Sequence, residues 1–150
     1  MTEQMTFRHS VPVQLRFNDL DPLGHVNNSV YFTFYDLGKV KYFAAVRPQM
    51  MELREIDLVI ANVNANFLLP IYLHEEIEVQ TTTLSIGNKS VKLLQRIVGV
   101  KNGEVKAVCE TILVGFDFKS GTTKVISDEW RKAIEAVSYT HLTLPTNSRV

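Results

Sequence analysis

The sequence predicts an α+β fold in which a curved antiparallel sheet wraps around one long helix. Two observations carry this prediction. The segment from Val30 to Val46 is apolar around most of its circumference, so a helix formed there must be covered by other protein. One segment of alternating polarity precedes it and four follow it, separated by turn residues. A single helix among five strands buries its apolar surface most simply when the sheet curls around it.

The region before the helix divides into a strand and a loop. From Val11 to Phe17 the odd positions are apolar, which predicts a half-buried strand. From Asn18 to Gly24 the chain collects Asn, Asp, Pro and Gly, a composition typical of a turn. Asn27, Asn28 and Ser29 are all favourable N-cap residues, so we expect the helix to begin directly after them.

The helix itself carries one narrow polar stripe, and the rest of its circumference is largely aromatic and aliphatic. The stripe comprises Ser29, Thr33, Asp36 and Lys39. Lys41 lies off the stripe, where its stem can extend outward with the charge in water. The aromatic face, Tyr31, Phe34, Tyr35 and Tyr42, is compatible with the lining of an acyl or aryl pocket, but aromatic residues on a buried helix usually belong to the core, which is the interpretation we favour.

After the helix the sequence predicts an antiparallel meander and one short C-terminal helix. The strands are expected at Ala61 to Phe67, Glu76 to Ser85, Ser90 to Val100 and Val105 to Phe116. The helix is expected at Asp128 to Val137, with Ser127 as its N-cap. Because one sheet of this size leaves apolar surface and free edges, we expect self-association as a homodimer or homotetramer.

Length and charge restrict the classes of function. The 150 residues fit one domain, residues 1–137, and the last segment, SYTHLTLPTNSRV at 138–150, resembles a vector-derived tail. Sixteen basic and sixteen acidic residues leave no net charge, which disfavours nucleic acid and anionic membranes as partners. The first ten residues do not resemble a targeting peptide, and no apolar run is long enough to span a bilayer, so we expect a cytoplasmic protein.

Five residues with acid–base or hydrogen-bonding side chains lie close together immediately before the helix: Asp19, Asp21, His25, Asn27 and Asn28. The first N–H groups of a helix lack intrahelical partners and lie at the positive end of its dipole, so they can polarise a carbonyl. A carboxylate slightly upstream can face the same point and activate water or attack directly. Thioester hydrolysis requires both elements.

The segment RFNDLDPLGHVNNSVYFTFYDLGKVKYF resembles the signature of the 4-hydroxybenzoyl-CoA thioesterase-like family of hotdog-fold acyl-CoA thioesterases. The resemblance covers roughly Phe7 to Val137, since the spacing to LVIANVNANFLLPIYLHEEIEVQTTTLSIGNKSVKL and AVCETILVGFDFKSG is also similar. It implies a hotdog fold, with the long helix wrapped by the sheet, and an acyl-CoA substrate hydrolysed to a free carboxylic acid and coenzyme A.

Carried over by position, the resemblance implies roles for five residues. Asp21 corresponds to the catalytic carboxylate, Asn28 to the residue whose backbone N–H polarises the thioester carbonyl, and His25 to a histidine that assists the carbonyl or the water. Lys89 and Ser90 correspond to a segment that approaches the phosphates of coenzyme A. By contrast, Asp19 is assigned to the turn and Asn27 to helix capping.

No cofactor and no metal are expected, because His9, His25 and His74 lack metal-ligand spacing. A hydratase or dehydratase of the same fold is disfavoured, since its acid and histidine stand five residues apart and Asp21 and His25 stand four apart. Two alternatives stay open: a non-catalytic acyl-CoA-binding protein and an acyl-carrier-protein thioesterase. Leu23 stands where plant acyl-carrier thioesterases have Asn, which weakens the second alternative.

Overall fold

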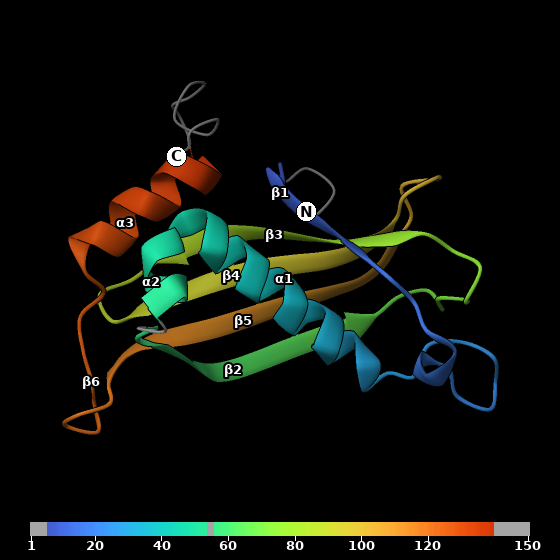
Figure 1. Cartoon of the computed structure of the whole chain (residues 1–150), viewed down its shortest axis with the longest axis horizontal. Coiled ribbons are helices and arrows are strands. Elements are labelled where there is room, and N and C mark those ends of the chain that lie inside the picture. Colours follow the sequence, from blue (N-terminus) through green and yellow to red (C-terminus); the bar gives the residue numbers. More distant parts are fainter. Residues whose placement is uncertain (1–5, 54–55, 140–150) are drawn as a thin grey trace.

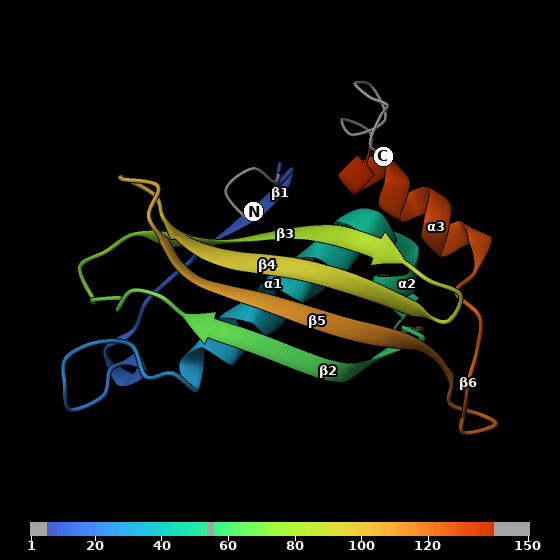
Figure 2. The same ribbon diagram turned by 180° about the vertical axis from the view of Figure 1, so that it is seen from behind.

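The computed structural model describes residues 6–53 and 56–139. An antiparallel sheet with strand order β1-β3-β4-β5-β2 lies against the long helix α1, and β6 pairs with β5 (Figures 1 and 2). The elements are β1 His9–Val13, α1 Val30–Val46, α2 Pro48–Leu53, β2 Leu58–Phe67, β3 Ile77–Ile86, β4 Ser90–Gly99, β5 Val105–Asp117, β6 Thr122–Thr123 and α3 Asp128–Ile134. The predicted arrangement of one helix and a curved antiparallel sheet is confirmed.

Irregularities in two strand pairs help to curve the sheet. The register between β3 and β4 shifts between Thr83 and Ser85, and that between β2 and β5 shifts between Ile60 and Asn62. An extra residue in one strand of a pair bends that strand and increases its twist. The bends let four long strands follow α1, which lies on one face of the sheet (Figure 1).

The core divides into two clusters along α1. One, near the start of the helix, contains Tyr31, Phe34 and Tyr35, packed with residues of β1, β3, β4 and β5. The other, near its end, contains Tyr42 and Phe43, together with residues of α3. Aromatic side chains therefore fix both ends of α1 against the sheet, and the end that starts the helix also adjoins the loop before it.

Between these clusters α1 approaches the sheet without an intervening side chain. A Cβ atom added at Gly38 would lie 2.6 Å from Val79 Cγ1 and 2.8 Å from Gln95 Nε2. The Gln95 amide donates hydrogen bonds to the backbone carbonyl of Tyr35 at 3.1 Å and to Thr81 Oγ1 at 3.0 Å. The glycine thus permits a close approach that one buried amide then fixes.

Three expectations about element boundaries and exposure were wrong in detail. β1 ends at Val13 rather than Phe17, because its partner β3 begins at Ile77, opposite Val13. Phe17 is exposed and starts a 3-10 turn instead. Lys39 is buried with its ammonium 3.8 Å from the carboxylate of Asp36, so it does not continue the exposed polar stripe.

The C-terminal helix begins as expected and ends differently. Ser127 Oγ accepts a hydrogen bond from the Trp130 N–H at 3.2 Å, which confirms the predicted N-cap. After Ile134 the helix changes to a π-helical turn, Glu135–Tyr139. Of the expected tail, 140–150 lies outside the described residues, and its assignment stays a prediction. No helix in the described part of the chain has the length and apolar character needed to cross a membrane.

Part of α1 and the edge of the sheet expose apolar side chains. Phe32, Leu37 and Val40 of α1 are exposed. β2 pairs only with β5 and therefore forms an edge of the sheet, where Val63 and Phe67 are also exposed. A single copy of the chain therefore leaves part of α1 uncovered, as expected for one sheet of this size.

The loop that joins β2 to β3 is fastened by an ion pair. Lys106 Nζ on β5 lies 2.7 Å from Glu75 Oε2 and 3.1 Å from Glu104 Oε1, and Lys106 is only 3% exposed. Burial alone would raise the pKa of Glu75, but the hydrogen bonds from Lys106 and from the Tyr72 N–H, together with the charge of Lys106, outweigh burial and hold that pKa below its ordinary value of 4.5. The carboxylate of Glu75 therefore stabilises the folded loop.

Gly38→Ala should lower the free energy of unfolding by about 1–2 kcal/mol, measured by urea denaturation. Overpacking a core typically costs about 1–3 kcal/mol, and the gain of roughly 1 kcal/mol in helix propensity offsets only part of it. Val79 is stiff at its branched Cβ, and Gln95 is held by two hydrogen bonds, so neither yields easily. The exposed control Thr33→Ala should not destabilise; a stabilised Gly38→Ala would contradict the close approach.

Glu75→Gln should destabilise the protein at pH 7 by about 1.5–3 kcal/mol, the usual range for a hydrogen bond to a charged group. Because the pKa of Glu75 is lowered on folding, its contribution is present above pH 4.5 and is lost as the pH falls below that value. Urea unfolding of the wild type and of Glu75→Gln should therefore show that their difference in free energy of unfolding decreases from pH 7 to pH 4. Glu76→Gln, the exposed neighbour, should show no such difference, and a gap that widened on acidification would refute this role.

Candidate functional site

The loop before α1 is built on Asp19, which is buried in a 3-10 turn, Phe17–Asp19. Its carboxylate accepts hydrogen bonds from the Arg16 N–H at 2.9 Å and from the Arg16 guanidinium at 3.2 Å. Its carbonyl accepts one from the Asn27 N–H at 2.9 Å. These bonds confirm that Asp19 is a turn residue, and they tie the start of the loop to its end.

The middle of the loop is attached to the segment that precedes β3. The Val26 N–H donates to the Ile71 carbonyl at 2.8 Å, and His25 and Tyr72 form an isolated antiparallel bridge. Within the loop, the Asp21 N–H donates to the His25 carbonyl at 2.9 Å. These contacts bring Asp21 and His25 together beside the start of α1.

The carboxylate of Asp21 has a separate environment on each oxygen. Oδ1 accepts a hydrogen bond from the Leu23 N–H at 2.9 Å, which forms part of the turn. Oδ2 lies 3.7 Å from His25 Nδ1, longer than a hydrogen bond but close enough for electrostatic contact. The side chains of Asp21 and His25 are 17% and 29% exposed, so both reach solvent or a ligand only in part.

The backbone N–H groups at the start of α1 have hydrogen-bond partners, with one exception. Asn27 Oδ1 accepts from the Ser29 N–H at 2.9 Å, as expected for a capping residue, and the Asn27 carbonyl accepts from the Val30 N–H at 2.9 Å. The Tyr31 N–H donates to the Asn28 carbonyl at 3.3 Å. Only the Asn28 N–H in this run, from residue 27 to 31, has no acceptor among the described residues.

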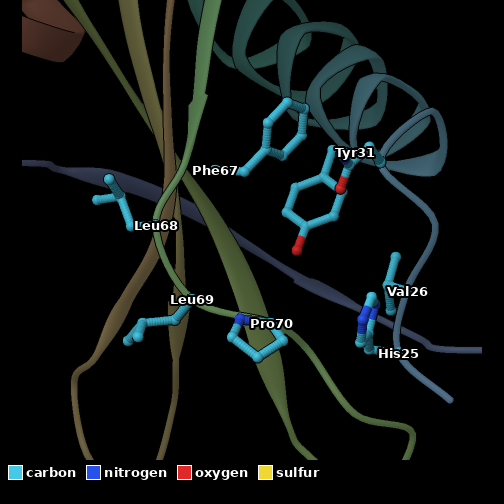
Figure 3. A pocket seen from close by; sticks show the side chains of 8 residues that line it. His25, Val26, Tyr31, Phe67, Leu68, Leu69 and Pro70 are labelled. Carbon is cyan, nitrogen blue, oxygen red and sulfur yellow. The ribbon is translucent and has the colours of Figure 1, made fainter. Parts of the chain in front are cut away.

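A pocket of about 190 Å³ opens beside this free N–H group. Its walls come from the loop before α1, the first turn of α1 and the end of β2 with the residues after it (Figure 3). The lining residues are His25, Val26, Asn28, Tyr31, Phe67, Leu68, Leu69 and Pro70. Asp21 is not among them, but its Oδ2 lies 3.7 Å from Nδ1 of His25, which is. One part of this wall, the segment FLLP at 67–70, was not predicted from the sequence. It is an apolar run in which the alternating pattern of the strand ends.

Lys89 and Ser90 lie elsewhere. Lys89 lies in the turn between β3 and β4, and Ser90 is the first residue of β4; the Lys89 carbonyl accepts a hydrogen bond from the Gly115 N–H at 2.9 Å. His25 is bridged to Tyr72, near the opposite end of β3. A ten-residue strand is about 30 Å long, so one chain does not bring these two residues to the pocket. Their contact with coenzyme A stays a prediction.

The groups around the pocket provide general acid–base and hydrogen-bonding chemistry. The imidazole of His25 can transfer a proton, the carboxylate of Asp21 can accept one, and the Asn28 N–H can donate to a carbonyl oxygen. Among residues 6–53 and 56–139, no three His, Cys, Asp or Glu side chains are grouped so that they could hold a metal ion.

Comparison with solved structures shows the same fold in thioesterases. A thioesterase from Thermus thermophilus, complexed with coenzyme A and Zn, is 32% identical with a TM-score of 0.79, over 89% of this chain and 96% of that one. A predicted thioesterase from Bacillus stearothermophilus is 23% identical with a TM-score of 0.77, over 86% and 95% of the two chains. At the lower identity the likeness concerns the fold alone. The predicted hotdog fold is confirmed.

The sequence matches one relative in part and one family model over most of its length. YsmA of Bacillus subtilis (strain 168), an uncharacterised protein, is 27% identical over 81 residues. That match spans about half the length of each chain, 54% in both cases. Residues 15–134 match the thioesterase-like superfamily, a range that includes the loop before α1, all of α1 and the main strands β2 to β5. The chain therefore belongs to the thioesterase-like superfamily, as its resemblance in sequence predicted.

Proposed function

We propose that this protein hydrolyses acyl-CoA thioesters to a free carboxylic acid and coenzyme A. The observation that carries the proposal is the free N–H of Asn28, just before α1, because Asn28 and His25 line the same pocket. A donor already fixed at the end of a 17-residue helix is suited to the negative charge that develops on a thioester oxygen. Membership of the thioesterase-like superfamily supports the same reaction.

In the proposed reaction, Asp21 acts as general base or as nucleophile. As a base, it takes a proton from water while the water oxygen attacks the carbonyl carbon; the C–S bond then breaks, and the sulfur of coenzyme A leaves with a proton. As a nucleophile, its carboxylate displaces the sulfur and forms a mixed anhydride, which water hydrolyses. In both routes the Asn28 N–H stabilises the oxyanion.

The position of His25 favours a related third route. His25 lines the pocket and Asp21 does not. Oδ2 of Asp21 lies 3.7 Å from Nδ1 of His25. In this route Asp21 fixes the orientation of the imidazole, and Nε2 of His25 takes the proton from water. The kcat values of single variants at Asp21 and His25 distinguish the routes. If Asp21 acts directly, its substitution should lower kcat more than substitution of His25 does.

The coenzyme A part of the substrate is assigned to Lys89 and Ser90 only as a prediction from resemblance. The turn that carries them is bound to the rest of the chain, since the guanidinium of Arg131 donates to the Gly87 carbonyl at 2.8 Å. A second copy of the chain would have to bring this turn to the pocket. The thioester could also be carried by an acyl-carrier protein, which would use other surface residues.

Asp21→Asn should lower kcat by at least about 100-fold, the usual range for loss of a general acid–base group being roughly 10²–10⁴. Asparagine keeps an oxygen for the Leu23 N–H, so the turn should survive. Thiol release from a panel of acyl-CoAs measures the change, with the exposed Glu110→Gln as control. Direct action by Asp21 predicts a smaller loss in His25→Asn, and action through His25 predicts equal losses.

Unchanged turnover in Asp21→Asn would remove that residue from the reaction. If the wild-type protein binds acyl-CoA and releases no thiol, it is a non-catalytic binding protein. If it releases thiol only from acyl-carrier substrates, the coenzyme A assignment is wrong and the hydrolase assignment stands.

We also propose that two copies associate along β2. The edge strand has no partner on its outer side among the described residues, and its apolar side chains adjoin the exposed face of α1. The rings of Phe32 and Phe67 lie 6.4 Å apart, which links the two surfaces. Pairing there would cover apolar area, satisfy the free backbone groups of β2 and extend the wall of the pocket at Phe67 and Leu68.

Val63→Lys should convert such a dimer to a monomer at micromolar concentration, measured by light scattering after size-exclusion chromatography. The substitution places a charge at the centre of the proposed edge contact, where pairing would remove it from water. Val125→Lys, on the exposed segment before α3, provides a matched control that should stay dimeric. An unaltered mass for Val63→Lys would place the contact elsewhere.

A further inference from the structure

We propose that the hydroxyl of Tyr31 selects acyl groups that carry an oxygen substituent close to the thioester, in preference to plain hydrocarbon chains of the same length. This inference rests on the proposed hydrolysis of acyl-CoA, and it concerns which acyl groups the pocket accepts. Tyr31 would then be a specificity residue rather than part of the oxyanion contact made by Asn28.

The side chain of Tyr31 is held in one place. It is only 2% exposed, and its ring makes an edge contact with Phe67 at 4.9 Å between centroids and a tilted contact with Phe34 at 6.5 Å. Figure 3 shows its hydroxyl pointing into the pocket, toward the space between Pro70 and His25. A ligand that fills this space would contact an oxygen whose position is already fixed.

No hydrogen bond joins that hydroxyl to another described residue, although the side chain is nearly fully buried and the charges of Lys106 and Glu75 act on it. Burial raises the pKa of Tyr31, so the phenol stays protonated at neutral pH and can both donate and accept. Several of the remaining walls are apolar: Val26, Phe67, Leu68, Leu69 and Pro70. A polar atom among such walls requires water or a ligand oxygen.

This arrangement discriminates between acyl groups. A hydrocarbon chain that covers the hydroxyl removes its water and offers no bond in return, whereas a hydroxyl or keto oxygen on the chain replaces that bond. Asn28 precedes α1 and Tyr31 lies in its first turn; the Tyr31 N–H donates to the Asn28 carbonyl at 3.3 Å, and both residues line the pocket. An oxygen on the first carbons after the thioester carbonyl therefore suits the geometry better than one at the end of a long chain.

The test compares butyryl-CoA with 2-hydroxybutyryl-CoA and 3-hydroxybutyryl-CoA in the full-length protein. The wild type should hydrolyse at least one hydroxylated substrate with a kcat/KM roughly 5- to 100-fold above that of butyryl-CoA. Tyr31→Phe, which keeps the ring, should abolish this ratio. Tyr35→Phe is the matched control: Tyr35 is also buried with an unpaired hydroxyl, lies on the same helix, and does not line the pocket. It should keep the ratio.

Three outcomes would overturn the inference: a wild-type preference for butyryl-CoA, a ratio unchanged in Tyr31→Phe, or an equal loss of kcat on all three substrates. If the wild type hydrolyses none of the three substrates, the proposed function fails on them. The inference about Tyr31 is then tested by ligand binding alone. Dissociation constants for S-butyl-CoA and the two matching S-hydroxybutyl-CoA thioethers, which cannot be hydrolysed, should then show the same preference in the wild type and its loss in Tyr31→Phe. Equal affinities would end the inference independently of catalysis.

Discussion

The close approach of α1 to β3 and β4 at Gly38 fixes where the candidate site can form. Because no side chain separates helix from sheet there, the Gln95 amide can bond the helix backbone at Tyr35 directly. The aromatic residues near the start of the helix then pack against the sheet, and the first turn of α1 comes to lie beside the end of β2. A helix held further from the sheet would leave its free N–H group without opposing walls.

The chemistry follows from how the loop before α1 satisfies its own hydrogen bonds. Asp19 and Asn27 bond the neighbouring backbone groups, and the Val26 N–H is used by Ile71, which leaves the Asn28 N–H without an acceptor among the described residues. Asn28 is exposed, and the first N–H groups of a helix ordinarily lack intrahelical partners; the proposed role of this group therefore depends on Asn28 also lining the pocket. The ion pair of Glu75 with Lys106 fastens the loop that carries Ile71. The pocket wall is therefore held in place by an interaction that does not involve Asp21, His25 or Asn28.

Much of the fold was predictable from local pattern, and the exceptions depended on tertiary contacts. The bounds of α1 and the starts of β4 and β5 follow from capping residues, turns and periodicity. The end of β1 depends on where its partner strand begins, and the burial of Lys39 depends on how α1 rotates against the sheet, so neither is visible in the sequence. Likewise the sequence indicates Asp21, His25 and Asn28 as neighbours, but it does not show that Asn28 alone keeps a free N–H or that Tyr31 points into the pocket.

The most direct measurement of the central claim follows the backbone amide of Asn28 by NMR. A coenzyme A analogue in which a methylene replaces the sulfur keeps the carbonyl, whereas a thioether keeps the sulfur and lacks the carbonyl. We expect the carbonyl analogue alone to move the Asn28 amide proton downfield and to slow its exchange with solvent, with smaller changes at Val30 and Tyr31, whose N–H groups are already bonded. An Asn28 amide that responds equally to both analogues, or to neither while both bind, would contradict the account.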